Sequence, residues 1–127
     1  MTEIQALLLI KSILESADIH GIENILAEDC EYMSTGRGII GRNRNETIEF
    51  LSSMAESIKA DNVPVTCKVM YITDVYEEDA LFHEGRHGLT VSYESGDNYV
   101  YMIFVDVNDE GLVDRIVSSQ ENYSIEY

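Results

Sequence analysis

The first third of the chain carries apolar residues at helical spacing. Between Glu3 and Ser16 they recur three or four positions apart, with Lys11 and Glu15 interleaved, and this spacing places side chains on one face of an α-helix. Further apolar residues widen that face well beyond a narrow stripe, so we expect a helix that the rest of the protein largely covers. The apolar positions are Ile4, Leu7, Leu8, Leu9, Ile10, Ile13 and Leu14.

Two further helices are expected in the first half of the chain. Asp18 has the side chain of an N-cap and precedes the apolar stretch Ile19–Ala27, which predicts a short second helix. Asn43 and Glu46 have the spacing of a capping box and open a third helix. Its apolar residues continue at helical spacing until the helix ends near Asp61, before the one proline of the chain.

The remaining apolar residues follow the two-residue period of β-strands. Cys30, Tyr32 and Ser34 occupy alternate positions of a short strand, and glycines then indicate a hairpin-like turn around residues 39 and 40. Long strands are expected over residues 63–76, 80–93, 99–107 and 112–119. Because tight polar turns join them, they form an antiparallel meander.

This order of elements predicts a single α+β domain over residues 1–127, in which three N-terminal helices pack on a strongly curved antiparallel sheet. The odd-numbered positions of the long strands carry the more apolar face, so we expect them to face the helices. Strand 99–107 is apolar on both faces and should be covered on both. The outer, even-numbered face carries Met70, Ile72, Tyr76 and Phe82. A monomer would expose this patch, so we expect a homodimer through the outer sheet face.

The net charge of the chain argues against two classes of binding partner. Twenty-four acidic and eight basic residues give a formal net charge of −16, whereas nucleic acids and anionic membranes attract basic surfaces. We therefore expect neither nucleic acid nor a membrane as a partner. The N-terminus lacks the basic region and cleavage site of a signal peptide. Cys30 and Cys67, without CxxC spacing, are expected to be free, buried thiols of a cytoplasmic protein.

Three strings resemble the nuclear transport factor 2-like superfamily, and its SnoaL-like branch in particular: DIHGIENILAEDCEYM, IIGRNRNETIEFL and VDVNDEGLVDRIVSS. The positions that match the family pattern are Asp18, Asp29, Gly41, Gly111, Val113, Arg115 and Ile116. The resemblance covers nearly the whole chain. It implies a cone-shaped, cystatin-like roll with a cavity between the concave sheet and the helices, and frequent dimers. It implies no single function, because members isomerise steroids, dehydrate or cyclise polyketides, hydrolyse epoxides or only bind partners.

His83 and His87 are the first candidates for chemistry in such a cavity. On a helix, their spacing would bring two ligands to one zinc ion. The neighbouring glycines and strand formers predict a strand instead, in which four residues span about 13 Å, so no metal site is expected. Both histidines share the parity of the inward-facing positions. Each could act as a general base or simply line the wall as a hydrogen-bonded side chain.

Asp106 is the least ordinary acid, because it interrupts an otherwise apolar strand. A carboxyl group in an apolar cavity has a raised pKa and can transfer a proton. The alternation along this strand does not determine which face of the sheet Asp106 occupies. The stretch YMSTGRG lacks the acid that the steroid isomerases of the family carry there. The Asp-Arg-Asp network of the epoxide hydrolases is suggested only by Asp114 and Arg115, and adjacent strand residues point to opposite faces.

Tyrosines complete the expected cavity, since they can stack on a flat ligand or hydrogen-bond to it. The predicted wall consists of Tyr32, Cys67, Tyr71, His83, His87 and Tyr101. Our first hypothesis is a SnoaL-like domain that binds a small, mainly apolar molecule and uses no cofactor. One alternative is a small isomerase, dehydratase or cyclase that uses a cavity histidine, assisted by Asp106 or a tyrosine. The other is a dimeric, non-catalytic interaction module for a basic protein partner.

Overall fold

The computed structural model describes residues 1–34, 37–61, 64–73, 85–93, 99–119 and 124–126. These residues form the α-helices α1 (Glu3–Ser16) and α2 (Arg44–Asp61) and a short 3₁₀ helix, η1 (Ile22–Asn24). The strands are β1 (Leu26–Ser34), β2 (Gly38–Gly41), β3 (Val65–Thr73), β4 (Arg86–Tyr93), β5 (Tyr99–Val107), β6 (Val113–Ser119) and β7 (Ser124–Glu126). Within the described residues, no helix is long and apolar enough to cross a lipid bilayer.

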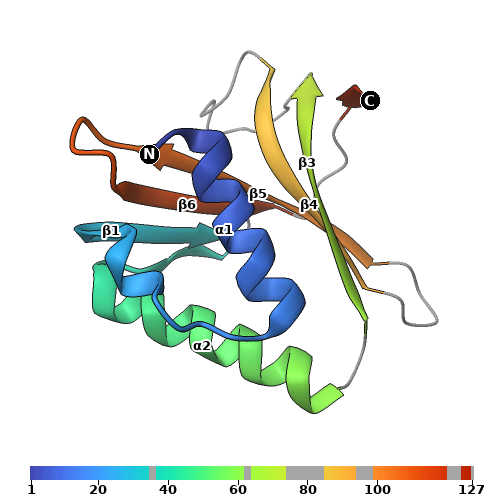
Figure 1. The fold of residues 1–127 in the computed structure, drawn as a ribbon, viewed down its shortest axis with the longest axis horizontal. Helices are drawn as coiled ribbons and strands as arrows, with labels where there is room; N and C mark the ends of the chain where they lie inside the picture. The colour runs from blue at the N-terminus through green and yellow to red at the C-terminus, as the bar shows by residue number, and fades with distance from the viewer. Residues whose placement is uncertain (35–36, 62–63, 74–84, 94–98, 120–123, 127) are drawn as a thin grey trace.

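The strands of the described residues form one curved sheet in the order β2-β1-β6-β5-β4-β3-β7 (Figure 1). β3, β4, β5 and β6 pair in succession and antiparallel, which confirms the predicted meander. β1 pairs with β6 in parallel, so the sheet is mixed and the prediction of a purely antiparallel sheet is wrong. Parallel neighbours are joined by long connections, and the local pattern of β1 carries no signal for a partner that lies so far along the chain.

Helix α1 has the predicted bounds, and a capping box between Thr2 and Gln5 begins it. It packs on β3, β4 and β5, while α2 packs on β1 and β2, so both helices lie on the same side of the sheet (Figure 1). The expectation that α1 is largely covered is wrong. Ile4, Leu8 and Leu9 are 41%, 49% and 42% exposed, because the sheet contacts only the side of the helix that carries the buried residues Ala6, Leu7, Ile10 and Leu14.

The predicted helix over Ile19–Ala27 is also wrong, since only η1 forms there and β1 already begins at Leu26. The Asp18 side chain accepts a hydrogen bond from the His20 N–H, 3.0 Å away, which makes a local turn in place of a helix cap. Gly21 follows with a φ of 88°, a left-handed conformation that interrupts a helix and favours glycine. The fold therefore has two α-helices among its described residues, where three were predicted.

Helix α2 confirms the predicted third helix. The Asn43 side chain accepts a hydrogen bond from the Glu46 N–H at 2.9 Å, as expected of an N-cap. The Glu46 carboxylate accepts from the Arg42 N–H at 3.3 Å, one residue before the position of a standard capping box. Just before the helix, a Cβ on Gly41 would lie 2.8 Å from the Thr47 hydroxyl, so this close approach requires glycine.

The inward orientation of the odd-numbered positions is confirmed for β3, β4 and β5, whereas in β6 the even-numbered Ile116 joins the inner cluster. Cys67, Leu89 and Val91 belong to one buried cluster with Leu7 and Ile10 of α1. Strand β5 is buried on both faces, as predicted: alternate residues Ile103 and Val105 join that cluster, while Met102 and Phe104 are 4% and 1% exposed on the opposite face.

The outer face is less exposed than expected. Ile72, predicted to lie in an open patch, is 0% exposed within the single chain, and only Met70 is partly exposed there. The other two predicted patch residues, Tyr76 and Phe82, lie outside the described residues. A homodimer was expected because a monomer would expose this apolar face, and that argument does not apply to Ile72. The homodimer itself stays a prediction.

Candidate functional site

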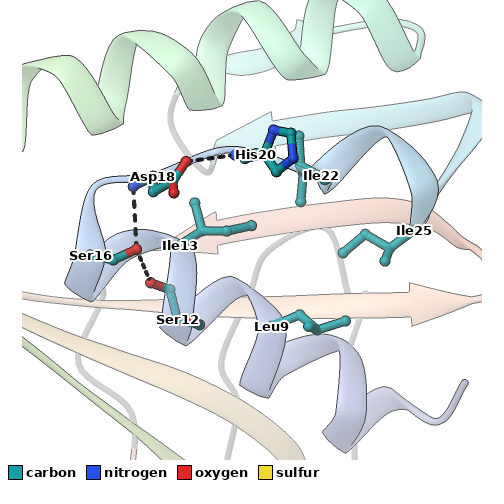
Figure 2. A pocket seen from close by; sticks show the side chains of 9 residues that line it. Leu9, Ser12, Ile13, Ser16, Asp18, His20, Ile22 and Ile25 are labelled. Atoms are coloured by element: carbon teal, nitrogen blue, oxygen red, sulfur yellow. Dashed lines mark hydrogen bonds between the residues drawn. The ribbon is translucent and has the colours of Figure 1, made fainter.

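A pocket of about 180 Å³ lies between α1 and the segment that leads through η1 towards β1 (Figure 2). Because the chain reverses direction after α1, a single short stretch of sequence supplies the whole lining. The lining residues are Leu9, Ser12, Ile13, Ser16, Asp18, His20, Gly21, Ile22 and Ile25.

The apolar part of the lining comes from two facing elements. Leu9 and Ile13 stand four residues apart on α1 and so share one face of the helix, and Ile22 and Ile25 approach them from η1 and its C-cap (Figure 2). Ile22 is 2% and Ile25 9% exposed, whereas Leu9 is 42% exposed. Ile22 and Ile25 therefore form a buried floor, Ile13 is partly exposed, and Leu9 stands at the open edge.

The polar part of the lining is a short chain of hydrogen bonds. The Ser16 hydroxyl donates to the Ser12 carbonyl oxygen at 2.6 Å and accepts from the Asp18 N–H at 3.3 Å. Asp18 Oδ1 in turn accepts from the His20 N–H at 3.0 Å (Figure 2). Ala17, between these residues, has a φ of 54°, the left-handed conformation that ends many helices. These bonds fix the turn and hold the Asp18 carboxylate at the exposed rim.

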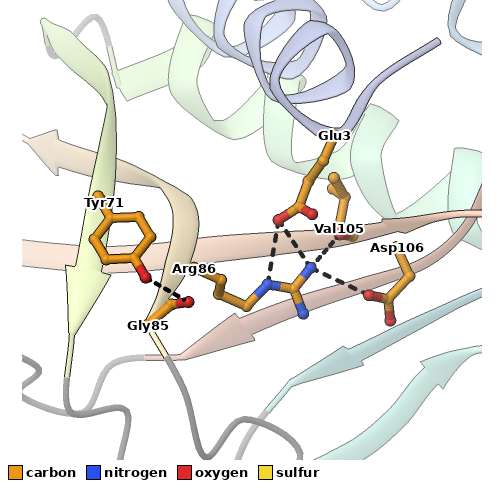
Figure 3. A network of polar contacts seen from close by, with 6 residues as sticks. All are labelled: Glu3, Tyr71, Gly85, Arg86, Val105 and Asp106. Carbon is orange, nitrogen blue, oxygen red and sulfur yellow. Dashed lines mark hydrogen bonds and ion pairs between the residues drawn. The ribbon is translucent and has the colours of Figure 1, made fainter.

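A second polar cluster joins α1 to the sheet. The Arg86 guanidinium donates to one oxygen of Glu3 at 2.9 and 3.2 Å, to the Val105 carbonyl at 2.6 Å and to Asp106 at 3.1 Å (Figure 3). It also lies 5.7 Å from the centre of the Phe104 ring, within the range of a cation–π contact. All these contacts tie the first turn of α1 to β4 and β5, so the geometry is that of a structural clamp.

Two of the predicted wall residues meet beside this clamp. Tyr71 and His87 are cross-strand partners of β3 and β4, with ring centres 5.3 Å apart in an edge-to-face arrangement. The Tyr71 hydroxyl donates to the Gly85 carbonyl oxygen at 3.0 Å (Figure 3). Because that proton is committed to a backbone oxygen, the contact between the two side chains is one of packing and not a proton relay.

No protein-family model and no curated protein matches the sequence, but the fold matches solved structures. A nuclear transport factor 2-like protein of unknown function from Mesorhizobium loti is 11% identical, with a TM-score of 0.66 over 94% of this chain and 91% of its own. An LEH-like epoxide hydrolase from M. tuberculosis is 17% identical, with a TM-score of 0.61 over 94% of this chain and 78% of its own. A cystatin-fold protein conserved in bacteria, from Silicibacter pomeroyi, is 16% identical, with a TM-score of 0.62 over 93% and 74%. The chain has a nuclear transport factor 2-like fold.

Within this nuclear transport factor 2-like fold, two predicted cavity residues belong to the buried core. Tyr32 is 1% exposed, and its ring lies 4.5 Å from that of Phe50. Cys67 is 2% exposed and packs among the aliphatic side chains under α1. Neither residue lines the pocket at η1. Their predicted contact with a ligand stays a prediction.

Two of the remaining predicted residues, Tyr101 and Asp106, belong to β5 of the nuclear transport factor 2-like sheet. His83 lies outside the described residues, as does the side chain of Tyr101. Asp106 is 46% exposed and paired with Arg86, so it is not the isolated carboxyl group of an apolar cavity. Burial, with the nearby Asp106 carboxylate, raises the pKa of Asp114. Among the described residues, no three histidine, cysteine or acidic side chains gather as metal ligands.

Sequence reasoning missed the pocket because it weighed each of its elements separately. Asp18 was assigned to a helix cap, and Leu9 and Ile13 were assigned to a covered helix. The available signal was Gly21 three residues after the N-cap-type aspartate Asp18, a combination that favours a turn over a helix. A turn there brings the following isoleucines back onto α1.

Proposed function

We propose that this protein binds a small, mainly apolar molecule in the pocket between α1 and η1. The observation that carries the proposal is the combination of a buried aliphatic floor and a polar rim in one open pocket. Ligand sites in proteins are typically concave and mostly apolar, with a few polar groups that orient the ligand. The ligand is assigned to this pocket and not to the predicted wall at Tyr32 and Cys67.

The volume of about 180 Å³ limits the ligand to one small ring or a short chain. A cavity of about 150 Å³ lined by apolar side chains accommodates benzene. Larger ligands would have to extend past Leu9 onto the exposed surface of α1. The aliphatic floor favours hydrocarbon surface, because its burial contributes about 25 cal/mol per Å².

The test is an NMR titration with neutral compounds of this size, such as 2-phenylethanol and cyclohexanol. Saturable shifts of the amide signals of Leu9, Ile13 and Ile22 are expected. Ser12→Phe places a large side chain in the pocket from the exposed side of α1 and should abolish these shifts. Ser57→Phe, an equally exposed serine on α2, is the matched control and should leave them unchanged. Shifts that survive Ser12→Phe, or that occur elsewhere, would contradict the proposal.

A second candidate function is docking of a basic protein partner, and the exposed apolar side of α1 favours it. Ile4, Leu8 and Leu9 are between 41% and 49% exposed, on a chain with a formal net charge of −16. A partner with an apolar face and basic flanks would match both features. Leu8→Gln should then weaken such a complex while leaving the titration with 2-phenylethanol unchanged. A complex insensitive to Leu8→Gln and to salt would remove this candidate.

A further inference from the structure

The pocket at η1 contains an uncompensated charge. Its lining includes one carboxylate, that of Asp18, and neither lysine nor arginine. The carboxylate receives one hydrogen bond, from the His20 N–H to Oδ1. No described lysine or arginine forms an ion pair with it, and its second oxygen has no partner in the described part of the chain. An exposed carboxylate at the mouth of an apolar pocket is available to a ligand.

The other polar side chains of the lining are the Ser12 and Ser16 hydroxyls and the His20 imidazole. The Ser16 hydroxyl both donates, to the Ser12 carbonyl oxygen, and accepts, from the Asp18 N–H. The Ser16 hydroxyl is therefore committed to the turn, which leaves the Ser12 hydroxyl and the His20 ring beside the carboxylate as groups that a ligand could contact. The Asp18 carboxylate is the one acidic group of this lining, and a carboxylate forms its strongest hydrogen bonds with charged donors.

The charge of the whole molecule acts in the same direction. Twenty-four acidic residues face eight basic ones, so the surrounding potential attracts cations and repels anions. The lysine nearest in sequence on α1, Lys11, is paired with Glu15 and is not free to neutralise Asp18. An anionic ligand would meet repulsion both from the rim and from the protein as a whole.

We propose that the ligand of this pocket is a small cationic amphiphile, an amine whose hydrocarbon part lies on Ile13, Ile22 and Ile25 and whose ammonium group pairs with Asp18. This inference rests on the proposed function, because it names the ligand class of the same pocket. An exposed ion pair contributes modestly to affinity. The apolar floor therefore contributes most of the binding free energy, and the carboxylate determines the selectivity for cationic over neutral and anionic ligands.

The experiment compares three compounds of similar shape: 2-phenylethylamine, 2-phenylethanol and phenylacetate. Each is titrated into the protein at low salt, and the amide shifts of Ile13 and Ile22 give the dissociation constants. The amine should bind about three- to fivefold more tightly than the alcohol, the effect of an exposed ion pair, and phenylacetate should bind most weakly. The advantage of the amine should decrease at high salt.

Asp18→Asn separates charge from structure, because an asparagine side chain can still accept the hydrogen bond from the His20 N–H. It should lower the affinity for the amine to that for the alcohol and leave the alcohol unchanged. Glu56→Gln, which removes one exposed charge from α2, is the matched control and should preserve the preference for the amine.

The two proposals fail in different ways. If all three compounds bind the pocket equally well and Asp18→Asn changes nothing, the inference about charge is overturned while the pocket remains a binding site. If Glu56→Gln reduces the preference as much as Asp18→Asn does, the selectivity belongs to the net charge and the role of Asp18 is overturned. If no compound shifts the pocket amides, both the proposed function and this inference are overturned.

Discussion

At the scale of single residues, burial controls the chemistry of the two thiols. Cys30 and Cys67 are free and buried, as predicted. Burial raises the pKa of each thiol to about 12, and the carboxylates of Asp114, for Cys30, and Glu15, for Cys67, act in the same direction. Since the thiolate is the reactive form, both side chains should behave as small apolar groups of the core.

This burial predicts slow alkylation of the native protein. At pH 8, a thiol with a pKa near 12 has roughly a thousandfold smaller thiolate fraction than one with a pKa near 9. Iodoacetamide should therefore leave both cysteines unmodified in the folded protein and modify both in denaturant, as measured by mass spectrometry. Rapid double alkylation without denaturant would show that the thiols are accessible.

The same pKa values predict a loss of stability in alkali. The folded-state pKa is raised from 9.0 to about 12, so the unfolded chain releases the thiol protons at lower pH than the folded chain does. The stabilisation is fully present below about pH 9 and is lost as the pH rises through the folded-state value. Urea midpoints measured between pH 8 and pH 11 should fall progressively, and the decrease should be smaller in Cys67→Ala relative to that variant's own value at pH 8.

At the scale of elements, Arg86 connects parts of the chain that local structure cannot connect. Its guanidinium contacts Glu3 in the first turn of α1 and Val105 and Asp106 of β5, and its own side chain is 17% exposed. Loss of a partly buried charged hydrogen-bonding group leaves its acceptors unpaired. The contacts of Arg86 should therefore stabilise the packing of α1 on the sheet.

Arg86→Gln should lower the free energy of unfolding by about 1–2 kcal/mol, a value reduced for the exposure of the two acids. Chemical denaturation measures the change, and Arg42→Gln, an exposed arginine on the turn before α2, is the matched control with little expected effect. Glu3→Gln combined with Arg86→Gln should cost less than the sum of the single changes. Strict additivity would show that the clamp contributes nothing as a unit.

The elements also show which parts of the fold the sequence could predict. α1, α2 and β5 were predictable because a cap or a continuous period lies within each segment itself. η1 was mistaken for a longer helix because a left-handed glycine, Gly21, outweighs the apolar spacing around it. The Arg86 clamp was out of reach for a different reason: it joins segments whose meeting depends on the complete sheet, and no local period encodes that meeting. The pocket depends on the chain reversal after α1, for which the turn at residues 18–21 is the local signal.

At the scale of the whole molecule, charge and the outer sheet face act against each other. The predicted homodimer would bring together two copies with a formal net charge of −16 each. Repulsion between such copies is long-ranged at low ionic strength, since the Debye length is about 30 Å at 0.01 M and about 10 Å at 0.1 M. Any dimer through the outer face must therefore gain more from apolar contact than it loses to this repulsion.

The predicted homodimer should consequently strengthen with salt. Light scattering at micromolar concentration should report a mass nearer to twice 14.4 kDa in 0.5 M than in 0.01 M sodium chloride, because screening removes repulsion and leaves apolar contact intact.

Met70→Glu adds a charge to the partly exposed outer face of β3 and should shift the protein towards the monomer. Gln5→Glu adds the same charge to the exposed side of α1 and should not. If Gln5→Glu is the variant that dissociates the dimer, the interface lies on α1. A mass of 14.4 kDa at every salt concentration would make the prediction of a homodimer wrong, and the charge would then be sufficient to keep the copies apart.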